Sequence, residues 1–261
     1  MGNGLTITSV AANKNEIPST FFIGDSHTGQ LLDFFLNSKE PLAYYTAAAT
    51  MAYGKYFSSM ENILYPKLRD RMNKFYETYK AVLAKLQDNS RVVITNHFLA
   101  YYGEFLKENN LKRNSDSIKL YVDALINDFD EQISLYPNLH FYICSDGINI
   151  PVSIVEQSKI DLKDSILQTF MKTGVTTSID IYAYENSVIL TKLKEYAKTK
   201  RNVYIINRLD TFKDDSSENN YKIILNNKNL YIDCNHQSAY GGQLLGKYII
   251  DSIKNNEETF K

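Results

Sequence analysis

The sequence predicts an α/β protein, a three-layer α/β/α sandwich in which helices cover both faces of a central, mostly parallel sheet. Short apolar runs alternate along the chain with longer segments of helical periodicity, and this alternation favours a parallel sheet. The chain has 261 residues, of which 44% are hydrophobic, so it is long enough to bury a full core. It contains no internal repeat and no linker rich in Pro or Gly. We therefore expect one domain over residues 1–261, with an irregular N-terminal segment over residues 1–18.

The expected strands are short apolar runs rich in β-branched and aromatic residues. The first run begins at Thr20 and ends directly before Gly24, and the run that ends at Cys144 is soon followed by Asp146 and Gly147. Small and polar residues of this kind mark the ends of buried strands. The five predicted strands of the sheet cover residues 20–23, 42–45, 91–95, 141–144 and 203–206.

The expected helices are segments in which apolar residues recur every three or four positions. The longest covers residues 61–87 and has Pro66 in its first turn, where proline is tolerated. A polar loop over 213–220 and a small hairpin, formed by 221–225 and 230–232, precede the last helix. The predicted helices cover residues 27–37, 61–87, 116–135, 154–171, 184–199 and 242–254.

The composition excludes several classes of protein. The chain has 29 Lys and Arg against 30 Asp and Glu, a net charge of −1, which argues against a nucleic-acid or anionic-membrane surface. It has no run of about 20 apolar residues that could span a bilayer. Residues 1–16 lack the basic and apolar regions of a secretory signal. We expect a cytoplasmic protein, or a periplasmic or cell-surface domain if the chain is part of a larger membrane protein.

Ser26 is the first candidate for chemistry. It lies in Gly24-Asp25-Ser26-His27, where an apolar strand ends and a helix begins. Open parallel sheets carry their active sites at this edge. The N–H groups of a helix start would stabilise an oxyanion beside the Ser26 hydroxyl. The alternative is that Asp25 or Ser26 only caps the helix.

Asp233 and His236 form the second candidate, in Asp233-Cys234-Asn235-His236 just before the last helix. The spacing lets the carboxylate accept a hydrogen bond from Nδ1–H of the imidazole, which leaves Nε2 free to take a proton from a serine. A metal-ligand pair or a polar turn is the alternative. A metal-dependent hydrolase would use Asp25, Asp233 and His236, but a metal site usually needs three or four ligands. We expect no metal and no cofactor.

The other titratable residues are weaker candidates. His27 has no acidic partner in a triad-like arrangement, so we do not expect it to be the general base. His140 opens a strand and is expected to be structural. Cys234 lies between Asp233 and His236, but a cysteine nucleophile would need its own activating environment, and Ser26 as the nucleophile explains more residues. Two cysteines, Cys144 and Cys234, are too few for a disulfide scaffold, and we do not expect them to pair.

Taken together, the two motifs resemble those of the SGNH (GDSL-like) hydrolase superfamily, over nearly the whole chain. Gly24-Asp25-Ser26-His27 is similar to the GDSH form of SGNH domains fused to acyltransferase-3 membrane proteins, which modify polysaccharides by O-acetylation. Residues 233–242 are similar to that group's DxxHLS block, with Gln237 in place of Leu. The resemblance implies an SGNH or flavodoxin-like sandwich in which Ser26 is the nucleophile, His236 the base and Asp233 the residue that orients it.

The resemblance also implies an oxyanion hole, which the family builds from the N–H of the nucleophile, a glycine N–H and an Asn side chain. This chain has no Gly-x-Asn-Asp block after the central strand. Asn96, in Thr95-Asn96-His97, is the best side-chain candidate. Gly54, in the loop after the second strand, is the candidate glycine, so the expected donors are Ser26, Gly54 and Asn96.

We expect a serine-dependent O-acetyltransferase or O-acetyl esterase that acts on a carbohydrate through an acetyl-enzyme on Ser26. Water or a sugar hydroxyl would then receive the acyl group. The expected partners are a carbohydrate or acyl-ester substrate and a fused or separate membrane acyltransferase, with no nucleic acid. The alternative is a non-catalytic glycan-binding domain with the same fold, whose 20 Tyr and 13 Phe would stack on sugars.

Overall fold

The computed structural model describes residues 6–10, 18–46, 66–156, 174–177, 180, 182–214 and 220–258. At its centre lies a six-stranded sheet with the strand order β1-β3-β2-β4-β5-β7. Only β1 is antiparallel to its neighbour, so the predicted, mostly parallel sheet is confirmed. Its strands are β1 (Thr6–Val10), β2 (Thr20–Gly24), β3 (Leu42–Thr46), β4 (Arg91–Ile94), β5 (His140–Cys144) and β7 (Val203–Ile206).

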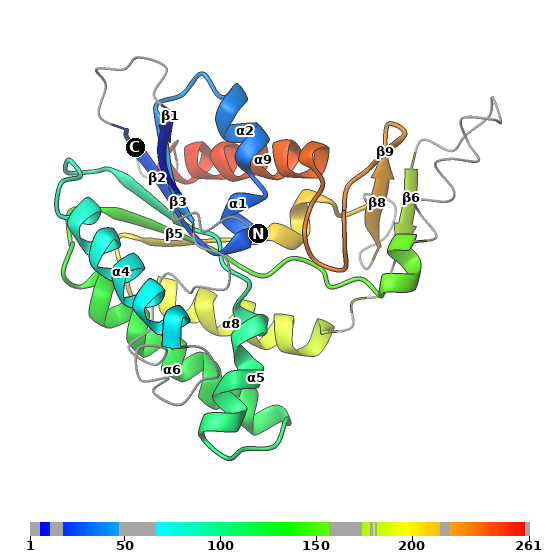
Figure 1. Cartoon of the computed structure of the whole chain (residues 1–261), viewed down its shortest axis with the longest axis horizontal. Helices are drawn as coiled ribbons and strands as arrows, with labels where there is room; N and C mark the ends of the chain where they lie inside the picture. The colour runs from blue at the N-terminus through cyan, green and yellow to red at the C-terminus, as the bar shows by residue number, and fades with distance from the viewer. Residues whose placement is uncertain are drawn as a thin grey trace.

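Helices cover both faces of this sheet (Figure 1). One face is covered by α4 (Pro66–Leu83), α5 (Phe98–Glu108), α6 (Ser115–Ile133) and α8 (Ala183–Lys198). The other face is covered by α2 (Leu32–Asn37) and α9 (Ala239–Glu258). The three-layer sandwich predicted from the alternating pattern is therefore confirmed.

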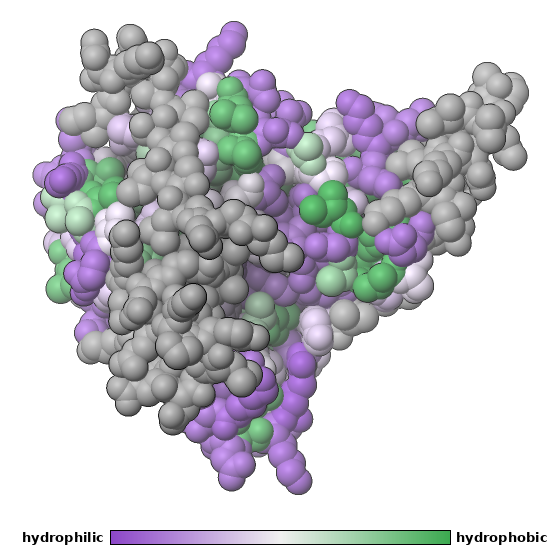
Figure 2. All heavy atoms as spheres, viewed as in Figure 1, coloured by the Kyte–Doolittle hydropathy of each residue, from purple (hydrophilic) through white to green (hydrophobic). Residues whose placement is uncertain are grey.

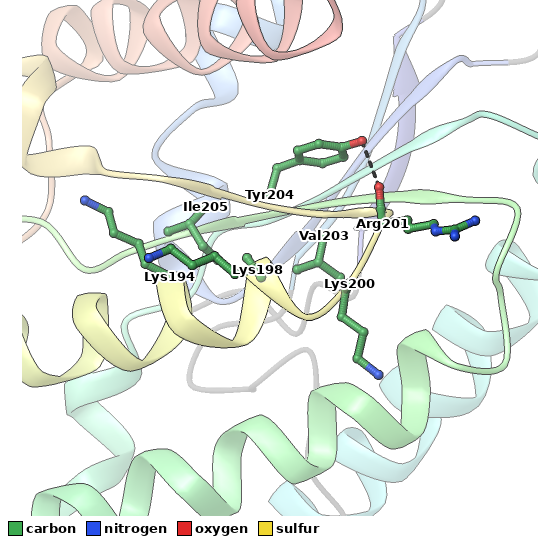
Figure 3. A pocket seen from close by; sticks show the side chains of 8 residues that line it. Lys194, Lys198, Lys200, Arg201, Val203, Tyr204 and Ile205 are labelled. Atoms are coloured by element: carbon green, nitrogen blue, oxygen red, sulfur yellow. Dashed lines mark hydrogen bonds between the residues drawn. The ribbon is translucent and has the colours of Figure 1, made fainter. Parts of the chain in front are cut away.

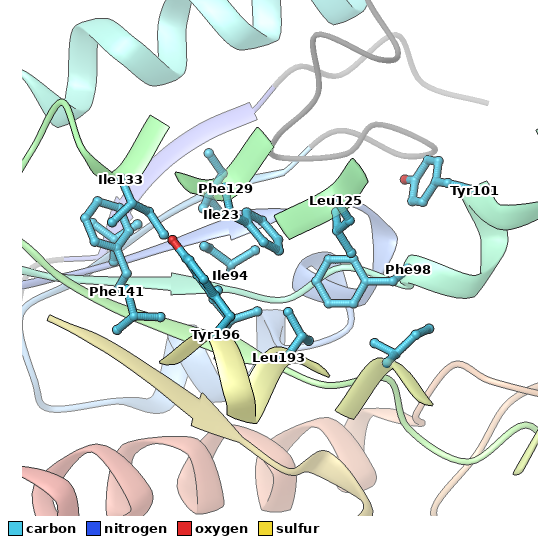
Figure 4. Packing of buried hydrophobic residues seen from close by; sticks show 14 of the residues in the cluster. Ile23, Ile94, Phe98, Tyr101, Leu125, Phe129, Ile133, Phe141, Leu193 and Tyr196 are labelled. Atoms are coloured by element: carbon cyan, nitrogen blue, oxygen red, sulfur yellow. The ribbon is translucent and has the colours of Figure 1, made fainter. Parts of the chain in front are cut away.

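The side chains of the strands alternate between two hydrophobic clusters, one on each face, as the pleat of a sheet requires. In β2, Phe21 and Ile23 belong to the cluster under α4, α5, α6 and α8, and Phe22 belongs to the one under α2 and α9. Figure 4 shows Ile23 packed among side chains of the first cluster, including Phe129 of α6. On the outside, hydrophobic residues gather over α2 (Figure 2), where Leu32 and Leu36 are exposed.

A second, smaller sheet has the order β6-β8-β9 and consists of β6 (Gly174–Thr177), β8 (Tyr221–Leu225) and β9 (Lys228–Asn229). The sequence predicted the β8 arm but placed its partner at 230–232. Asn226 and Asn227 both have positive φ, of 51° and 56°, as a tight two-residue turn requires. The partner strand therefore starts at Lys228.

Several other expectations need correction. Residues 6–10 form β1, although we expected residues 1–18 to be irregular. The helix expected over 27–37 is divided into α1 (Ser26–Gly29) and α2. The last helix begins at Ala239, three residues before its predicted start. Residues 61–65 of the longest predicted helix, and most of the one predicted over 154–171, lie outside the described residues.

Helix α5 was missed because it has no local start signal. Its first turn receives no hydrogen bond from the side chain of its own N-cap residue, His97. The N–H groups of Phe98 and Leu99 instead donate to the two carboxylate oxygens of Asp146, each at 2.8 Å. The cap therefore comes from the loop after β5, where no local pattern could reveal it.

The parallel strands end at one edge of the sheet, where the following loops meet. β2 leads into Ser26, β4 into Asn96 and β5 into Asp146, and β7 leads into the 3-10 helix η1 (Arg208–Thr211). Active sites of open α/β sheets form at this edge.

Candidate active site

Ser26 is held in place by the sharp change of chain direction after β2. Gly24, the last residue of β2, has a φ of 155°, and a Cβ at this position would overlap the carbonyl oxygen of Thr95. Glycine alone fits this position without strain. Asp25 caps α1, because its Oδ1 accepts a hydrogen bond from the N–H of His27 at 2.9 Å. The cap is thus Asp25, and the Ser26 hydroxyl remains free for another contact.

That contact is with His236, in the loop between β9 and α9. The Oγ atom of Ser26 lies 2.8 Å from Nε2 of His236. On the other side of the ring, Nδ1 lies 2.9 Å from Oδ2 of Asp233. The structure therefore brings together the three residues that the two sequence motifs predicted, in the order serine, imidazole and carboxylate.

The Asp233 loop is fixed by its own backbone. Oδ1 of Asp233 accepts hydrogen bonds from the N–H groups of Asn235, at 2.9 Å, and His236, at 2.7 Å. Burial raises the pKa of Asp233, but these hydrogen bonds and the neighbouring His236 ring outweigh it and leave the pKa below its usual value. Asp233 is therefore a carboxylate at neutral pH, able to accept the Nδ1–H of His236.

His27 lies against the ring of His236, on the side of the protein interior. Its ring is buried and stacks on the ring of His236, with centroids 4.5 Å apart and planes inclined by 24°. A second ring, that of His97, lies 4.8 Å from His27 at an angle of 50°. The sequence did not predict this group of three imidazoles, because their positions in the chain are far apart.

The carboxylate of Asp25 holds His27 and His97 in place through hydrogen bonds to their backbones. Besides the N–H of His27, this carboxylate accepts the N–H of His97 at 3.0 Å and the hydroxyl of Tyr101 at 2.9 Å. Burial opposes the charge, but the His27 ring and the backbone donors outweigh it and hold the pKa of Asp25 well below its usual value. The same burial lowers the pKa of His27 to about 4, although Asp25 acts against it. At neutral pH, Asp25 is therefore a carboxylate and His27 is a neutral imidazole.

Asn96, the expected side chain of the oxyanion hole, is fully buried two residues after β4. Its carbonyl accepts a hydrogen bond from Nη2 of Arg208 at 2.9 Å, and its side chain hydrogen-bonds to the hydroxyl of Tyr101. Arg208 is itself buried and pairs with Asp146 at 3.4 Å. Gly54, the expected glycine of the oxyanion hole, lies outside the described residues.

A direct contact joins the segment after Ser26 to the segment after His236, although the two are 207 positions apart in the chain. The side-chain oxygen of Gln30, just after α1, accepts the N–H of Gln237 at 2.9 Å. At the start of α9, a Cβ on Gly242 would overlap the carbonyl oxygen of Gln30. The backbone of α9 therefore touches the segment that carries Ser26, and the loop with His236 is held against it.

Within the part of the chain that the structure describes, no group of three or more His, Cys, Asp or Glu residues is arranged to hold a metal ion. The Asp25 carboxylate, one ligand of the metal alternative, is directed to backbone N–H groups and to Tyr101. Cys144, which is buried, and Cys234 are both free thiols in this structure.

The sequence of the chain matches a family model described as an SGNH domain fused to AT3 domains, over residues 6–251. The chain belongs to this SGNH family. The same family was expected from the Gly-Asp-Ser-His and Asp-x-x-His motifs. No curated protein matches the sequence.

Two solved structures resemble this SGNH domain. The periplasmic domain of a lipopolysaccharide acetyltransferase from Salmonella ser. Paratyphi A aligns with a TM-score of 0.58 and 13% identity, over 91% of this chain and 84% of that one. A protein from Streptococcus pneumonia, described as a candidate platelet activating factor, aligns with a TM-score of 0.51 and 14% identity, over 92% and 85%. At these identities the likeness establishes the fold.

Among the described residues of the SGNH domain, no helix is long and apolar enough to cross a membrane. An open hollow lies away from Ser26, at the beginning of β7, and is lined by the end of α8 and by Val203, Tyr204 and Ile205. Its basic side chains diverge, as Figure 3 shows for Lys194, Lys200 and Arg201. Lys200 is paired with Asp130. The hollow therefore lacks a converging set of charges that would hold an anion.

Proposed function

We propose that this SGNH domain is a serine-dependent O-acetyltransferase or O-acetyl esterase that acts on a carbohydrate through an acetyl-enzyme on Ser26. The observation that carries the proposal is the bridge formed by His236, with Ser26 at 2.8 Å and Asp233 at 2.9 Å. A serine nucleophile, an imidazole base and a carboxylate that orients the imidazole are the three groups that a Ser-His-Asp triad uses for acyl transfer.

In the first half of the reaction, Oγ of Ser26 attacks the carbonyl carbon of an acetyl ester while Nε2 of His236 takes the hydroxyl proton. Asp233 holds the Nδ1–H and stabilises the imidazolium that forms. The tetrahedral intermediate collapses to the acetyl-enzyme, and His236 gives its proton to the departing alcohol oxygen.

In the second half, His236 takes a proton from an acceptor hydroxyl, which attacks the acetyl-enzyme. As the tetrahedral intermediate collapses, His236 returns the proton to Oγ of Ser26, and the free serine is restored. With water as the acceptor the products are acetate and free enzyme. With a sugar hydroxyl the product is an O-acetylated glycan. Both outcomes use the same three residues.

The oxyanion would be held by the N–H of Ser26, the side chain of Asn96 and the N–H of Gly54. Asn96 is supported by its position after β4, at the same edge of the sheet as Ser26. Its backbone is also held in place, because its carbonyl accepts a hydrogen bond from Arg208. For Gly54 the support is the family resemblance alone.

Fusion of this family to AT3 domains and the likeness to an acetyltransferase domain favour transfer to a glycan over hydrolysis. In this proposal a fused or associated membrane acyltransferase supplies the acetyl group, and the domain works in the periplasm or at the cell surface. The near-zero net charge suits a neutral or weakly charged glycan.

Two experiments test the proposal. A fluorophosphonate probe should label Ser26 in the native protein and fail to label the Ser26→Ala variant, whereas a binding module without catalysis would not react. The protein should then be given an activated acetyl ester with a series of glycans, followed by mass spectrometry. Acetylated sugar supports the transferase, and free acetate at every acceptor concentration identifies an esterase.

A further inference from the structure

We propose that His27 is a positioning residue for His236: its flat ring holds the imidazole of the base in the plane that joins Asp233 to Ser26. This inference rests on the proposed function, because it assigns a task to the residue directly after the nucleophile. The observation that carries it is the stacking of the two rings, with centroids 4.5 Å apart and planes inclined by 24°.

The two hydrogen bonds of His236 do not by themselves fix its ring. Hydrogen bonds to the ring nitrogens make no contact with the faces of the ring, and the side chain of Asp233 is about half exposed, so the loop has solvent on one side. The buried ring of His27 supplies a flat contact on one face, at the normal distance of offset-stacked rings. Rotation of His236 away from Ser26 would lose this contact.

His27 is in turn immobilised by its surroundings. Its backbone N–H is bound to Asp25, and its Nδ1 lies 3.4 Å from the same carboxylate. The ring of His97 contacts it on another side, and Nδ1 of His97 accepts a hydrogen bond from the Asn235 side chain at 3.4 Å. Asn235 directly precedes His236, so the stack of rings and the loop of the base form one connected unit.

The charges around His27 keep its ring neutral. The titratable and charged groups that face it are Asp25, His97, His236 and Arg208. Burial is the largest effect and disfavours a cation, and Arg208 acts in the same direction against the attraction of Asp25. A neutral ring is required in this place, because a positive charge stacked on His236 would oppose the imidazolium that forms when Ser26 gives up its proton.

A matched pair of substitutions, His27→Phe and His27→Leu, tests the role of the flat ring. Both remove the nitrogen atoms and fill similar volumes, but only Phe retains an aromatic face. With 4-nitrophenyl acetate as substrate, His27→Phe should keep kcat within about threefold of the wild type. His27→Leu should lower kcat by about ten- to hundredfold with little change in KM, as a small misplacement of a catalytic group does. His140→Ala, at the far end of β5, is the control and should leave kcat unchanged.

Nitrogen-15 NMR of the imidazole rings gives a readout that a merely structural role would not change. In the wild type and in His27→Phe, neutral His236 should carry its proton on Nδ1 only, and in His27→Leu both tautomers should appear. The proposal is overturned if His27→Leu keeps wild-type kcat and a single tautomer, or if His27→Phe loses as much activity as His27→Leu.

The wild-type protein provides a test that needs no variant. The ring of His27 should show the nitrogen shifts of a neutral imidazole from pH 8 down to pH 5, and a cationic ring in this range would overturn the proposal. Ser26→Ala separates the two claims: if it keeps full activity, the proposed function fails, while the tautomer of His236 still decides whether His27 positions it.

Discussion

Nε2 of His236 lies 2.8 Å from Oγ of Ser26, although 210 positions separate the two residues in the chain. This contact joins the start of α1, directly after the first parallel strand, to the loop before the last helix. Replacement of either residue should therefore abolish acyl transfer and leave the fold unchanged. We expect Ser26→Ala and His236→Ala each to lower kcat on an acetyl ester by about 10⁴- to 10⁶-fold.

Steady-state kinetics with 4-nitrophenyl acetate would measure this loss, with circular dichroism as the check on folding. His140→Ala is the matched histidine control, since His140 lies at the start of β5 and stacks on Tyr204. Hydrolysis by Ser26→Ala at near wild-type rate would refute the assignment of the nucleophile.

Replacement of Asp233 by Asn should also reduce activity, through the tautomer of His236. The Asn side chain can present an N–H to Nδ1, which would favour the wrong tautomer and leave no acceptor at Nε2. We expect a loss of kcat of about 10⁴-fold, as found when a triad aspartate becomes asparagine. An imidazole NMR signal that still shows the proton on Nδ1, together with full activity, would contradict this role.

The stability of the protein should fall as the pH falls below the usual pKa of histidine, because His27 is buried as a neutral ring. Its pKa is lowered from 6.5 to about 4, so between these values the unfolded chain binds a proton that the folded chain does not. The stabilisation is complete above about pH 6.5 and declines as the pH drops toward 4. The expected loss is on the order of 3 kcal/mol.

Urea unfolding at pH 7, 5.5 and 4 would measure this decline. The depressed pKa of Asp25 adds a further loss at still lower pH, because there the unfolded chain binds a proton at this carboxylate that the folded chain does not. His27→Phe is the control, and its stability should depend less on pH between 7 and 4. An equal slope in both proteins would show that other groups cause the decline.

Asp146 should be one of the most sensitive positions for stability outside the proposed triad. Its carboxylate caps α5 through Phe98 and Leu99, at 2.8 Å each, and pairs with the buried Arg208. Asp146→Ala would leave a buried guanidinium without its partner, which costs about 3–5 kcal/mol.

The matched control for this experiment is Asp123→Ala. Asp123 pairs with Lys192 at 2.5 Å on the surface and is about half exposed, so its loss should cost less than about 1 kcal/mol. Chemical unfolding measures both variants. Similar values for the two would show that the buried network does not stabilise the fold.

Gly24→Ala should be poorly tolerated. A methyl group there would meet the carbonyl of Thr95 and would have to adopt a φ of 155°, which L-residues rarely do. We expect a large loss of soluble, folded protein. Gly103→Ala is the control, because Gly103 lies in α5 with no atom near the position of a Cβ, and alanine should stabilise the helix by about 0.5–1 kcal/mol. Thermal melts of the two variants should move in opposite directions.

The sequence alone determined the layers of the fold and the three residues that meet at the site. Buried strands appear as apolar runs, and helices as a period of three to four residues, so β2, β4, β5, β7, α6 and α8 were predicted to within two residues. Asp233 and His236 are three positions apart and contact each other locally. Their link to Ser26 followed from the resemblance to a family, since no local pattern spans that distance.

The tertiary structure alone decided what surrounds these three residues. The cap of α5 comes from Asp146, 48 positions away from Phe98, and the carbonyl of Asn96 is held by Arg208, 112 positions away. The stack of His27 on His236 depends on how α1 and the last loop approach each other. Such contacts depend on how distant segments pack against one another. The order of residues along the chain does not give these relative positions. For this reason the sequence indicated His236 as the candidate base, and only the fold showed that the ring of His27 stacks on it.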